Sequence, residues 1–307
     1  SVPGRPRSLS RQQHVLDFSR ADVRDHIYQQ MTAILDCVPI DYIKWDMNRN
    51  IKECYSSKLP SDRQGEVFHR YILGVYDLYE RLTNEFPEVL FESCASGGGR
   101  FDPGMLYYAP QGWTSDDSDA IERLKIQYGT SMCYPLSSIG SHVSVVPNHQ
   151  VFRNTPLHTR ANVAYFGTFG YELDLNKLTE EEIKEVKEQI TFMKEYREVL
   201  QFGTFYRLKS PFEGNETVWM VTNEDRTLAI VGYYRVVNGV NQPYSRVRLQ
   251  GLNPDMIYEN VWNHTENYGD ELMNYGLITS DVTAGEVPGN VTPCTDFESR
   301  IYMLKGK

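Results

Sequence analysis

The sequence has few cysteines and no long apolar run. Its five cysteines, Cys37, Cys54, Cys94, Cys133 and Cys294, are widely spaced along 307 residues, and none forms a C-x-x-C pair. A sparse, odd-numbered set argues against a disulfide framework and against a cysteine-ligated zinc site, and favours a reducing, cytoplasmic location. No apolar stretch reaches the roughly 20 residues of a membrane-spanning helix, so we expect no membrane partner.

Basic residues are in the minority as well. The chain carries 31 Lys and Arg against 41 Asp and Glu, a formal net charge of -10. Because nucleic-acid phosphates require clustered Lys and Arg, we expect no nucleic-acid partner.

Tyrosine, by contrast, is abundant, with 21 Tyr against 13 Phe and 4 Trp. Rings that carry a hydroxyl suit a carbohydrate-facing cleft, although half-buried packing explains most of them.

The first two thirds of the chain alternate helical and strand patterns. In order, the patterns predict a helix that opens at Ser19 and Asp22, a strand at 41–46, a helix with an apolar stripe from Val67 to Leu82, a strand at 89–93, and a short helix at 120–128. Strands that alternate with helices pair in parallel through helical crossovers. Both a (β/α)8 barrel and an open doubly wound sheet fit this order, and each carries its active site at the carboxyl ends of its strands.

The pattern changes near residue 204. Thr179 and Glu182 form a T-x-x-E capping box, which predicts a helix that extends to about Leu200. After this helix come short alternating segments separated by Gly, Asn and Pro, at 217–221, 228–234 and 299–304. Such segments predict an antiparallel β-sandwich of about 100 residues.

Lys44, Asp46 and Asn48 are spaced two residues apart in the strand-like segment KWDMN. Alternating strand residues project to the same side, so we expect these three side chains to lie together. A cation beside a carboxylate favours its ionised form, which a nucleophile requires, and an amide suits sugar hydroxyls. A surface ion pair at a strand end is the alternative explanation.

Three acids occur within four residues at Asp116, Asp117 and Asp119. If they are close and partly buried they do not all ionise at low cost, so one of them is a candidate proton donor with a raised pKa. The alternative is helix capping, which we assign to Ser118 or Asp119. That assignment leaves Asp116 and Asp117 to be explained.

A third motif, ESCASGGGR at 92–100, contains three consecutive glycines. Glycine allows close backbone approach to a ligand, although a tight turn explains such a run equally well. The two acidic motifs place two carboxylates at different strand ends, which is the minimum for glycoside hydrolysis, and the glycine motif lies between them in the sequence. A metal site and a non-catalytic sugar-binding module are alternatives, but no His-x-x-x-His pattern and no Asp-x-Asp pair within a predicted strand favours a metal. His142, His149 and His158 are scattered and are interpreted as structural, or as supports for the residues that contact a ligand.

The motifs KWDMNR, ESCASGGGRFD and GWTSDDSDA, in this order, resemble bacterial α-galactosidases of glycoside hydrolase family 36. Pro3–Asp25 and the segment FGTFGYELDL at 166–175 are similar to the same family. The pattern C-x-x-G-x-G-R, from Cys94 to Arg100, is similar to the branch that acts on melibiose and raffinose. The resemblance covers nearly the whole chain.

The resemblance implies a role for each matching residue. Asp46 would be the nucleophile that forms a galactosyl-enzyme, and Asp116 would be the acid/base. The galactose subsite would be lined by Arg11, Lys44, Trp45, Met47, Asn48 and Cys94. The resemblance implies a galactoside partner, no cofactor or metal, retention of the α configuration, and a homo-oligomer in the full-length form.

The resemblance also implies a fold and a missing part. Residues 1–202 would form the C-terminal part of a (β/α)8 barrel, about strands 4 to 8, and residues 203–307 an antiparallel β-sandwich domain. Family members carry an N-terminal β-sandwich and the first three barrel strands, with an Asp pair and a Trp for the galactose hydroxyls, before the point where this chain begins. We therefore expect the chain alone to be a poor catalyst. A transglycosylase, an inert fragment and a galactoside-binding module are the alternatives.

Overall fold

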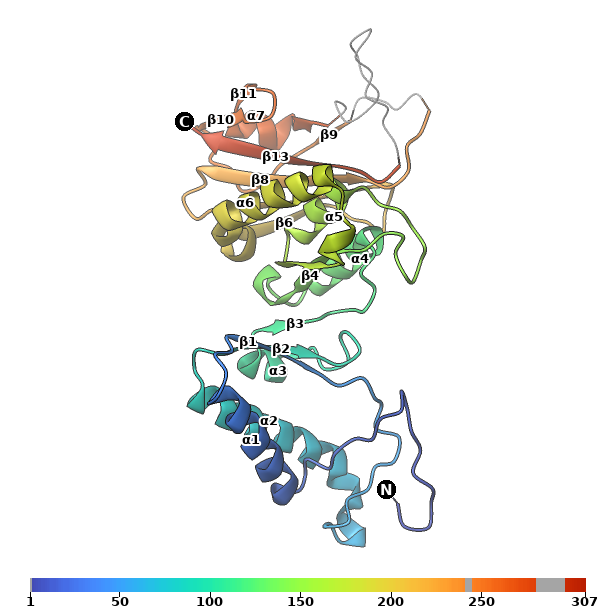
Figure 1. Ribbon diagram of the computed structural model, residues 1–307. Helices are drawn as coiled ribbons and strands as arrows, with labels where there is room; N and C mark the ends of the chain where they lie inside the picture. Colours follow the sequence, from blue (N-terminus) through green and yellow to red (C-terminus); the bar gives the residue numbers. More distant parts are fainter. Residues whose placement is uncertain (1, 241–244, 280–295) are drawn as a thin grey trace. The chain divides into compact units, whose positions relative to one another are not determined.

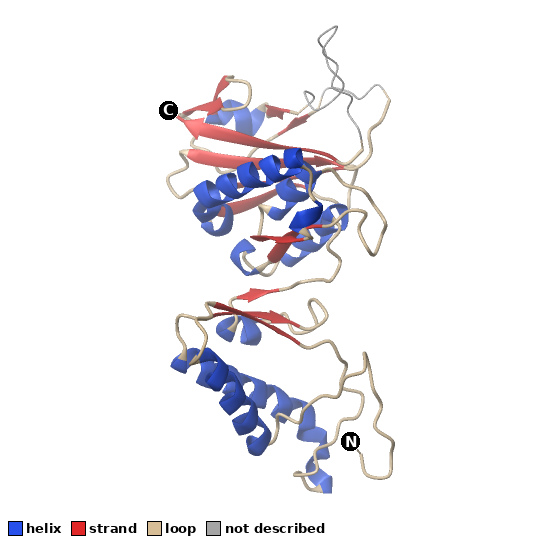
Figure 2. Ribbon diagram, in the orientation of Figure 1, coloured by secondary structure: helices blue, strands red, loops and turns tan. Residues whose placement is uncertain are grey.

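A computed structural model of the chain describes residues 2–240, 245–279 and 296–307 (Figures 1 and 2). The chain forms two compact units, which meet in sequence between Asp116 and Asp117. The predicted division into domains at residues 202 and 203 differs from this junction and stays a prediction.

The first unit contains a parallel sheet with the strand order β1-β2-β3. Its elements are α1 (Ala21–Leu35), β1 (Tyr42–Asp46), the 3-10 helix η1 (Ser61–Glu66), α2 (Val67–Glu85), β2 (Leu90–Cys94), α3 (Pro103–Tyr108) and β3 (Gln111–Gly112). Both strand pairs are parallel and are connected through helices. The alternation predicted from the sequence is confirmed here.

Helix α2 forms the core of this unit. The five residues of its predicted stripe, Val67, Tyr71, Val75, Leu78 and Leu82, are all buried. They pack with Phe18 and Phe91 and with the apolar residues of α1, which are only partly buried. Because the stripe recurs at helical spacing, one face of α2 contacts both the sheet and α1.

The start of α1 differs from the prediction. The helix begins at Ala21, and its N-cap residue Arg20 makes no side-chain cap. Ser19 therefore lies one residue before the cap position, and its hydroxyl donates to Asp17. The predicted start of the helix at Ser19 is wrong, because the residue at the cap position is Arg20.

The second unit begins with a helical part around a two-stranded parallel sheet, β4-β5. Its elements are α4 (Ala120–Thr130), η2 (Leu136–Ser138), β4 (Gly140–Ser144), α5 (Leu157–Ala164), β5 (Thr168–Glu172), η3 (Leu175–Lys177) and α6 (Glu180–Phe202). The predicted capping box at Thr179 and Glu182 is confirmed, since each side chain bonds to the other residue's backbone N–H. Among the described residues, no helix combines the length and apolar character needed to cross a membrane.

An antiparallel sheet of six strands follows, in the order β11-β10-β13-β8-β7-β6. The elements after α6 are β6 (Thr204–Lys209), β7 (Glu216–Thr222), β8 (Leu228–Arg235), β9 (Arg246–Val247), β10 (Ile257–Asn260), β11 (Glu266–Tyr268), α7 (Gly269–Asn274), β12 (Leu277–Ile278) and β13 (Glu298–Gly306). The predicted antiparallel strands at 217–221, 228–234 and 299–304 are confirmed as β7, β8 and β13.

Both faces of the six-stranded sheet are buried. Trp219 and Ile230 belong to the cluster that includes residues of α5 and α6, and Figure 1 shows α6 lying along the sheet. Val218 and Val231, which alternate with them, pack with Val247 of β9 and Leu272 of α7 instead. The short β9–β12 pair and α7 thus cover the second face, and a complete β-sandwich stays a prediction.

Candidate active site

Parallel pairing of β1 with β2 places the first two motifs side by side. Asp46 lies opposite Cys94, and Lys44 lies opposite Glu92. Because strand residues alternate between faces, Lys44 and Asp46 project to one side of β1, and Trp45 projects to the other. The indole of Trp45 packs against Tyr79 of α2, with 4.6 Å between the ring centroids. The side of β1 that carries Lys44 and Asp46 is its exposed side.

The Asp46 carboxylate accepts hydrogen bonds from the side chains of Cys94 and Asn48. Partial burial acts to raise the pKa of Asp46, but these two hydrogen bonds, the Met47 backbone N–H and the charge of Lys44 outweigh it, so the pKa lies below its ordinary value. Asn48 is in turn held by Ser96, whose hydroxyl donates to the amide oxygen over 3.2 Å. Asp46 is therefore an ionised carboxylate in a fixed orientation.

Cys94 is a hydrogen-bond donor at neutral pH. Burial, together with its hydrogen bond to Asp46, raises the pKa of the thiol to about 11. The group consequently keeps its proton and donates it to the carboxylate rather than acting as a nucleophile. The remaining described cysteines, Cys37, Cys54 and Cys133, are also free thiols.

Lys44 lies between an acid and an aromatic ring. Its Nζ is 3.4 Å from Oε1 of Glu92 and 5.0 Å from the ring centroid of Trp113. Glu92 also accepts hydrogen bonds from the hydroxyl of Tyr42 and from Nε2 of Gln111. Sequence reasoning missed Glu92, Tyr42 and Gln111. The register of the two parallel strands was the signal that could have revealed Glu92, because it places Glu92 opposite Lys44.

The glycine run allows two backbone segments to approach each other. Gly97 has a φ of 79°, and a Cβ on it would lie 2.7 Å from Cα of Ser115 and 2.8 Å from the backbone nitrogen of Asp116. A Cβ on Gly98 would lie 2.7 Å from the carbonyl oxygen of Thr114. The turn after Cys94 therefore packs directly against the backbone that carries Asp116.

The three neighbouring acids have different surroundings. Asp119 is the N-cap of α4, since its side chain accepts from the backbone N–H groups of Ile121 and Glu122, and it pairs with Arg153. Burial raises the pKa of Asp119 despite these partners. The predicted cap is confirmed, and the raised pKa belongs to a carboxylate already engaged in capping.

Asp117 interacts with residues of the second unit. Its Oδ1 accepts the backbone N–H of Asp119 over 3.1 Å. Its negative charge also acts on the guanidinium of Arg123, whose pKa burial lowers to about 10. Arg123 is fully buried and donates to the carbonyl oxygen of Gly140. Asp117 thus stabilises the positive charge of the buried Arg123 as well as the turn before α4.

These contacts do not bring the side chains of three predicted sugar-binding residues to the Asp46 carboxylate. Trp45 faces α2, and the Met47 sulfur accepts a hydrogen bond from the Tyr71 hydroxyl over 3.5 Å. Arg11 lies in an exposed turn between Ser10 and Gln13 and has a φ of 50°. Their place in a sugar subsite stays a prediction.

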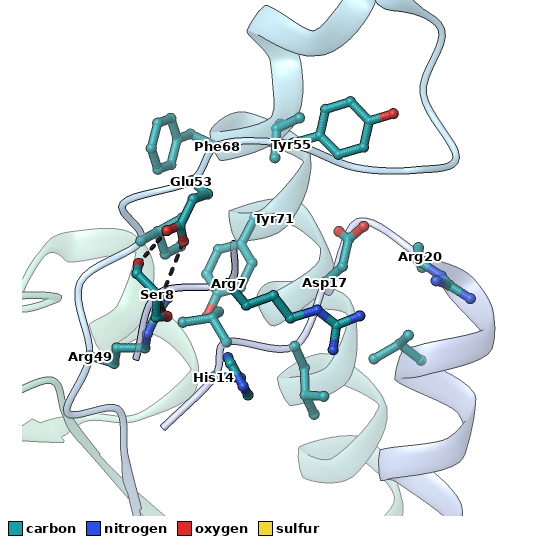
Figure 3. Close-up of a pocket in the computed structure, with 15 residues that line it drawn as sticks. Arg7, Ser8, His14, Asp17, Arg20, Arg49, Glu53, Tyr55, Phe68 and Tyr71 are labelled. Carbon is teal, nitrogen blue, oxygen red and sulfur yellow. Dashed lines mark hydrogen bonds and ion pairs between the residues drawn. The ribbon is translucent and has the colours of Figure 1, made fainter. Parts of the chain in front are cut away.

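A separate cavity of about 360 Å³ lies in the first unit, between the N-terminal segment and α2 (Figure 3). Neither Asp46 nor Cys94 lines it. Figure 3 shows Glu53 joined to Ser8 and Arg49, and the Arg49 guanidinium also donates to the Ser8 carbonyl oxygen over 2.6 Å. These contacts tie the N-terminal segment to the loop after β1.

The sequence matches two family models. Residues 1–203 match the model described as Melibiase, and residues 216–304 match the C-terminal domain of glycosyl hydrolase family 36. The chain is 55% identical over 276 residues to alpha-galactosidase AgaA of Geobacillus stearothermophilus, covering 90% of this chain and 38% of that protein. It is 52% identical over 305 residues to alpha-galactosidase Mel36A of Lactobacillus acidophilus, covering 99% and 40%. It therefore spans about two fifths of these relatives.

Solved structures of alpha-galactosidases also match this chain over nearly its whole length. The crystal structure of AgaA superposes with a TM-score of 0.93 at 52% identity and covers 100% of this chain and 41% of that chain. An alpha-galactosidase of Lactobacillus brevis gives a TM-score of 0.94 at 48% identity, with 99% and 41% covered. Two AgaA variants, each with an aspartate replaced, were solved with raffinose and with stachyose. Those two aspartates are separated by the same number of residues as Asp46 and Asp116.

Proposed function

The chain belongs to glycosyl hydrolase family 36, and from this membership we propose that the complete protein releases terminal α-D-galactose from α-galactosides with retention of configuration. Melibiose and raffinose-type oligosaccharides are the proposed substrates, since AgaA variants were solved with raffinose and stachyose. The observation that carries the proposal is the Asp46 carboxylate, which Cys94, Asn48 and Lys44 together hold in its ionised form. An ionised, oriented carboxylate is what the first step of a retaining glycosidase requires.

In the proposed mechanism Asp46 attacks the anomeric carbon of the bound galactose. The bond to the glycosidic oxygen breaks, and Asp116 donates a proton to that oxygen, so the aglycone leaves as an alcohol. The product of this step is a galactosyl-enzyme ester of β configuration at Asp46. Asp116, now ionised, takes a proton from water as the water attacks the anomeric carbon. The bond from that carbon to the Asp46 oxygen breaks, the Asp46 carboxylate is restored, and α-galactose is released.

Two further observations support this assignment. The spacing of Asp46 and Asp116 is that of the two aspartates replaced in the AgaA complexes, as expected if they are the two reacting carboxylates. The glycine turn after Cys94 also packs against Ser115 and Asp116, which couples the acid/base segment to the strand beside the nucleophile. Lys44, Asn48 and Cys94 are proposed to contact the sugar hydroxyls. Arg11, Trp45 and Met47 are included on the resemblance alone.

The proposed fold of the complete catalytic domain is a (β/α)8 barrel to which this chain contributes about strands 4 to 8. The three parallel strands β1-β2-β3 and the parallel pair β4-β5 fit that order. The exposed face of β1 would then point toward the barrel interior, where the active site lies at the carboxyl ends of the strands. A cytoplasmic location, a homo-oligomeric state and poor activity of this chain alone stay predictions from the sequence.

The test uses the full-length enzyme and follows the anomeric configuration of the first galactose released from melibiose by proton NMR. We expect α-galactose to appear first and to mutarotate afterwards. A β-linked galactoside serves as the control and should not be cleaved. Initial release of β-galactose would overturn the retaining mechanism, and no release of galactose would overturn the proposed activity.

A further inference from the structure

Glu92 is a buried carboxylate beside the proposed nucleophile, and the mechanism above gives it no role. It lies on β2, opposite Lys44 of β1 and Gln111 of β3. Its side chain is only 2% exposed. Burial of a carboxylate is unfavourable unless the group is paired and hydrogen-bonded, so its partners indicate its role.

The two oxygens of Glu92 have different partners. Oε2 accepts hydrogen bonds from the hydroxyl of Tyr42 and, over 3.2 Å, from Nε2 of Gln111. Gln111 also donates to the Tyr42 hydroxyl over 3.3 Å. Oε1 lies 3.4 Å from Nζ of Lys44. Neutral donors from the two flanking strands thus fix the carboxylate, and its other oxygen faces the ammonium group.

Lys44 needs such support because its side chain is long and 37% exposed. An unsupported lysine ammonium of this kind samples many rotamers and is strongly hydrated. Here it lies between Oε1 of Glu92 and the ring of Trp113. From this position its charge contributes to lowering the pKa of Asp46, two residues further along β1.

We propose that Glu92 is a positioning residue for the reaction, acting through Lys44. Its carboxylate holds the Lys44 ammonium beside Asp46, where the ammonium favours the ionised nucleophile and meets the hydroxyls of the bound galactose. Glu92 itself does not touch the sugar. The role deepens the proposed function and rests on it, since it assigns a residue to the same hydrolytic reaction.

A double-mutant cycle in the full-length enzyme tests this role. The variants are Glu92→Gln, Lys44→Met and the double replacement, and kcat/KM is measured with p-nitrophenyl α-galactoside. Glu92→Gln keeps an oxygen for the Tyr42 hydroxyl and removes the charge that holds Lys44. It should reduce kcat/KM roughly tenfold when Lys44 is present and less than about twofold in the Lys44→Met background. Equal losses in both backgrounds would mean that Glu92 supports only the fold, and would overturn the proposal.

A second comparison remains decisive if Lys44→Met, which leaves the Glu92 charge buried without its ammonium partner, fails to fold. Glu92→Asp keeps the charge but shortens the side chain, whereas Glu92→Gln keeps the size but loses the charge. If the charge positions Lys44, Glu92→Asp should retain more activity than Glu92→Gln. The reverse order, with thermal unfolding midpoints that follow activity, would overturn the proposal.

Wild-type turnover separates the two hypotheses. A wild-type enzyme that does not cleave α-galactosides would overturn both the proposed function and the role of Glu92. An active wild-type enzyme whose variants show equal losses in the two Lys44 backgrounds would overturn only the role of Glu92.

Discussion

Asp46 and Cys94 lie opposite each other at the ends of two neighbouring parallel strands, and the thiol of Cys94 donates a hydrogen bond to the carboxylate of Asp46. The pairing is a direct consequence of the β1–β2 register, which also sets Lys44 beside Glu92. Burial raises the pKa of Cys94 to about 11, so the donor keeps its proton at any pH at which the enzyme is expected to work. Asp46, the proposed nucleophile, thus has a neutral donor on the neighbouring strand and a paired cation, Lys44, two residues before it on its own strand.

Cys94→Ala should move the acid limb of the kcat/KM profile to higher pH. Asp46 must be ionised to attack, so activity is lost as the pH falls through its pKa. The hydrogen bond from Cys94 lowers that pKa, and its removal should raise it. The measurement is kcat/KM of the full-length enzyme between pH 3 and pH 8. Cys37→Ala, at an exposed free cysteine, is the matched control and should leave the limb in place. An unmoved limb in Cys94→Ala would show that the thiol does not tune Asp46.

Asp46→Gly should abolish the galactosyl-enzyme and lower kcat/KM by roughly 10⁴-fold or more, as the loss of a nucleophile does in other covalent enzymes. Added azide enters the space that the carboxylate leaves and attacks the same face of the sugar. Turnover should therefore return in azide, with β-galactosyl azide as the product. Its configuration is measured by proton NMR, and an α-azide would show that Asp46 is not the nucleophile.

Local sequence patterns predicted the elements of this chain better than the contacts between them. The stripe of α2 from Val67 to Leu82 was predicted correctly, as was a cap at Ser118 or Asp119, which the structure places at Asp119. Each of these features depends on residues within a few positions. The predicted start at Ser19 was wrong, because the helix begins at Ala21 and the cap position falls on Arg20. The motif order gave the family through a resemblance, and the periodicity of the chain alone left a barrel and an open sheet equally consistent.

Glu92 illustrates what the sequence could not supply. Its partners, Tyr42, Lys44 and Gln111, come from strands before and after it, and none lies near it in sequence. Only the strand register brings them together. The same holds for Gly97, whose role depends on a segment that returns from a later strand. The sequence suggested a ligand or a tight turn there, and the structure shows a turn that packs against the backbone of Ser115 and Asp116.

Gly97→Ala should destabilise the enzyme and impair proton transfer by Asp116. Gly97 has a φ of 79°, and a new Cβ would lie 2.7 Å from Cα of Ser115 and 2.8 Å from the nitrogen of Asp116. Strain of this kind costs about 1–3 kcal/mol, and relief requires movement of the segment that carries Asp116, the proposed acid/base. The thermal unfolding midpoint should fall, and hydrolysis of melibiose should fall more than hydrolysis of p-nitrophenyl α-galactoside. Gly65→Ala is the control, because its Cβ would have no atom within 4 Å. Unchanged behaviour in Gly97→Ala would mean that the two segments do not pack as described.

Asp116→Ala and Asp117→Ala should separate the acid/base from its neighbour. Asp117 accepts the backbone N–H of Asp119, and its charge acts on the buried guanidinium of Arg123, so its replacement should mainly reduce stability. Asp116 lies on the segment packed against the glycine turn and is proposed to donate the proton. A poor leaving group needs that proton, whereas p-nitrophenolate leaves without it.

The decisive comparison is kcat/KM for melibiose against p-nitrophenyl α-galactoside in both variants, with the pH profile of each. Asp116→Ala should lower the rate for melibiose by roughly 10²–10⁴-fold, affect the activated substrate far less, and flatten the basic limb of the profile. Asp117→Ala should lower the thermal unfolding midpoint and change both substrates to a similar extent. If Asp117→Ala instead shows the selective loss on melibiose and Asp116→Ala does not, the proton donor is Asp117, and the support of Arg123 is secondary to that role.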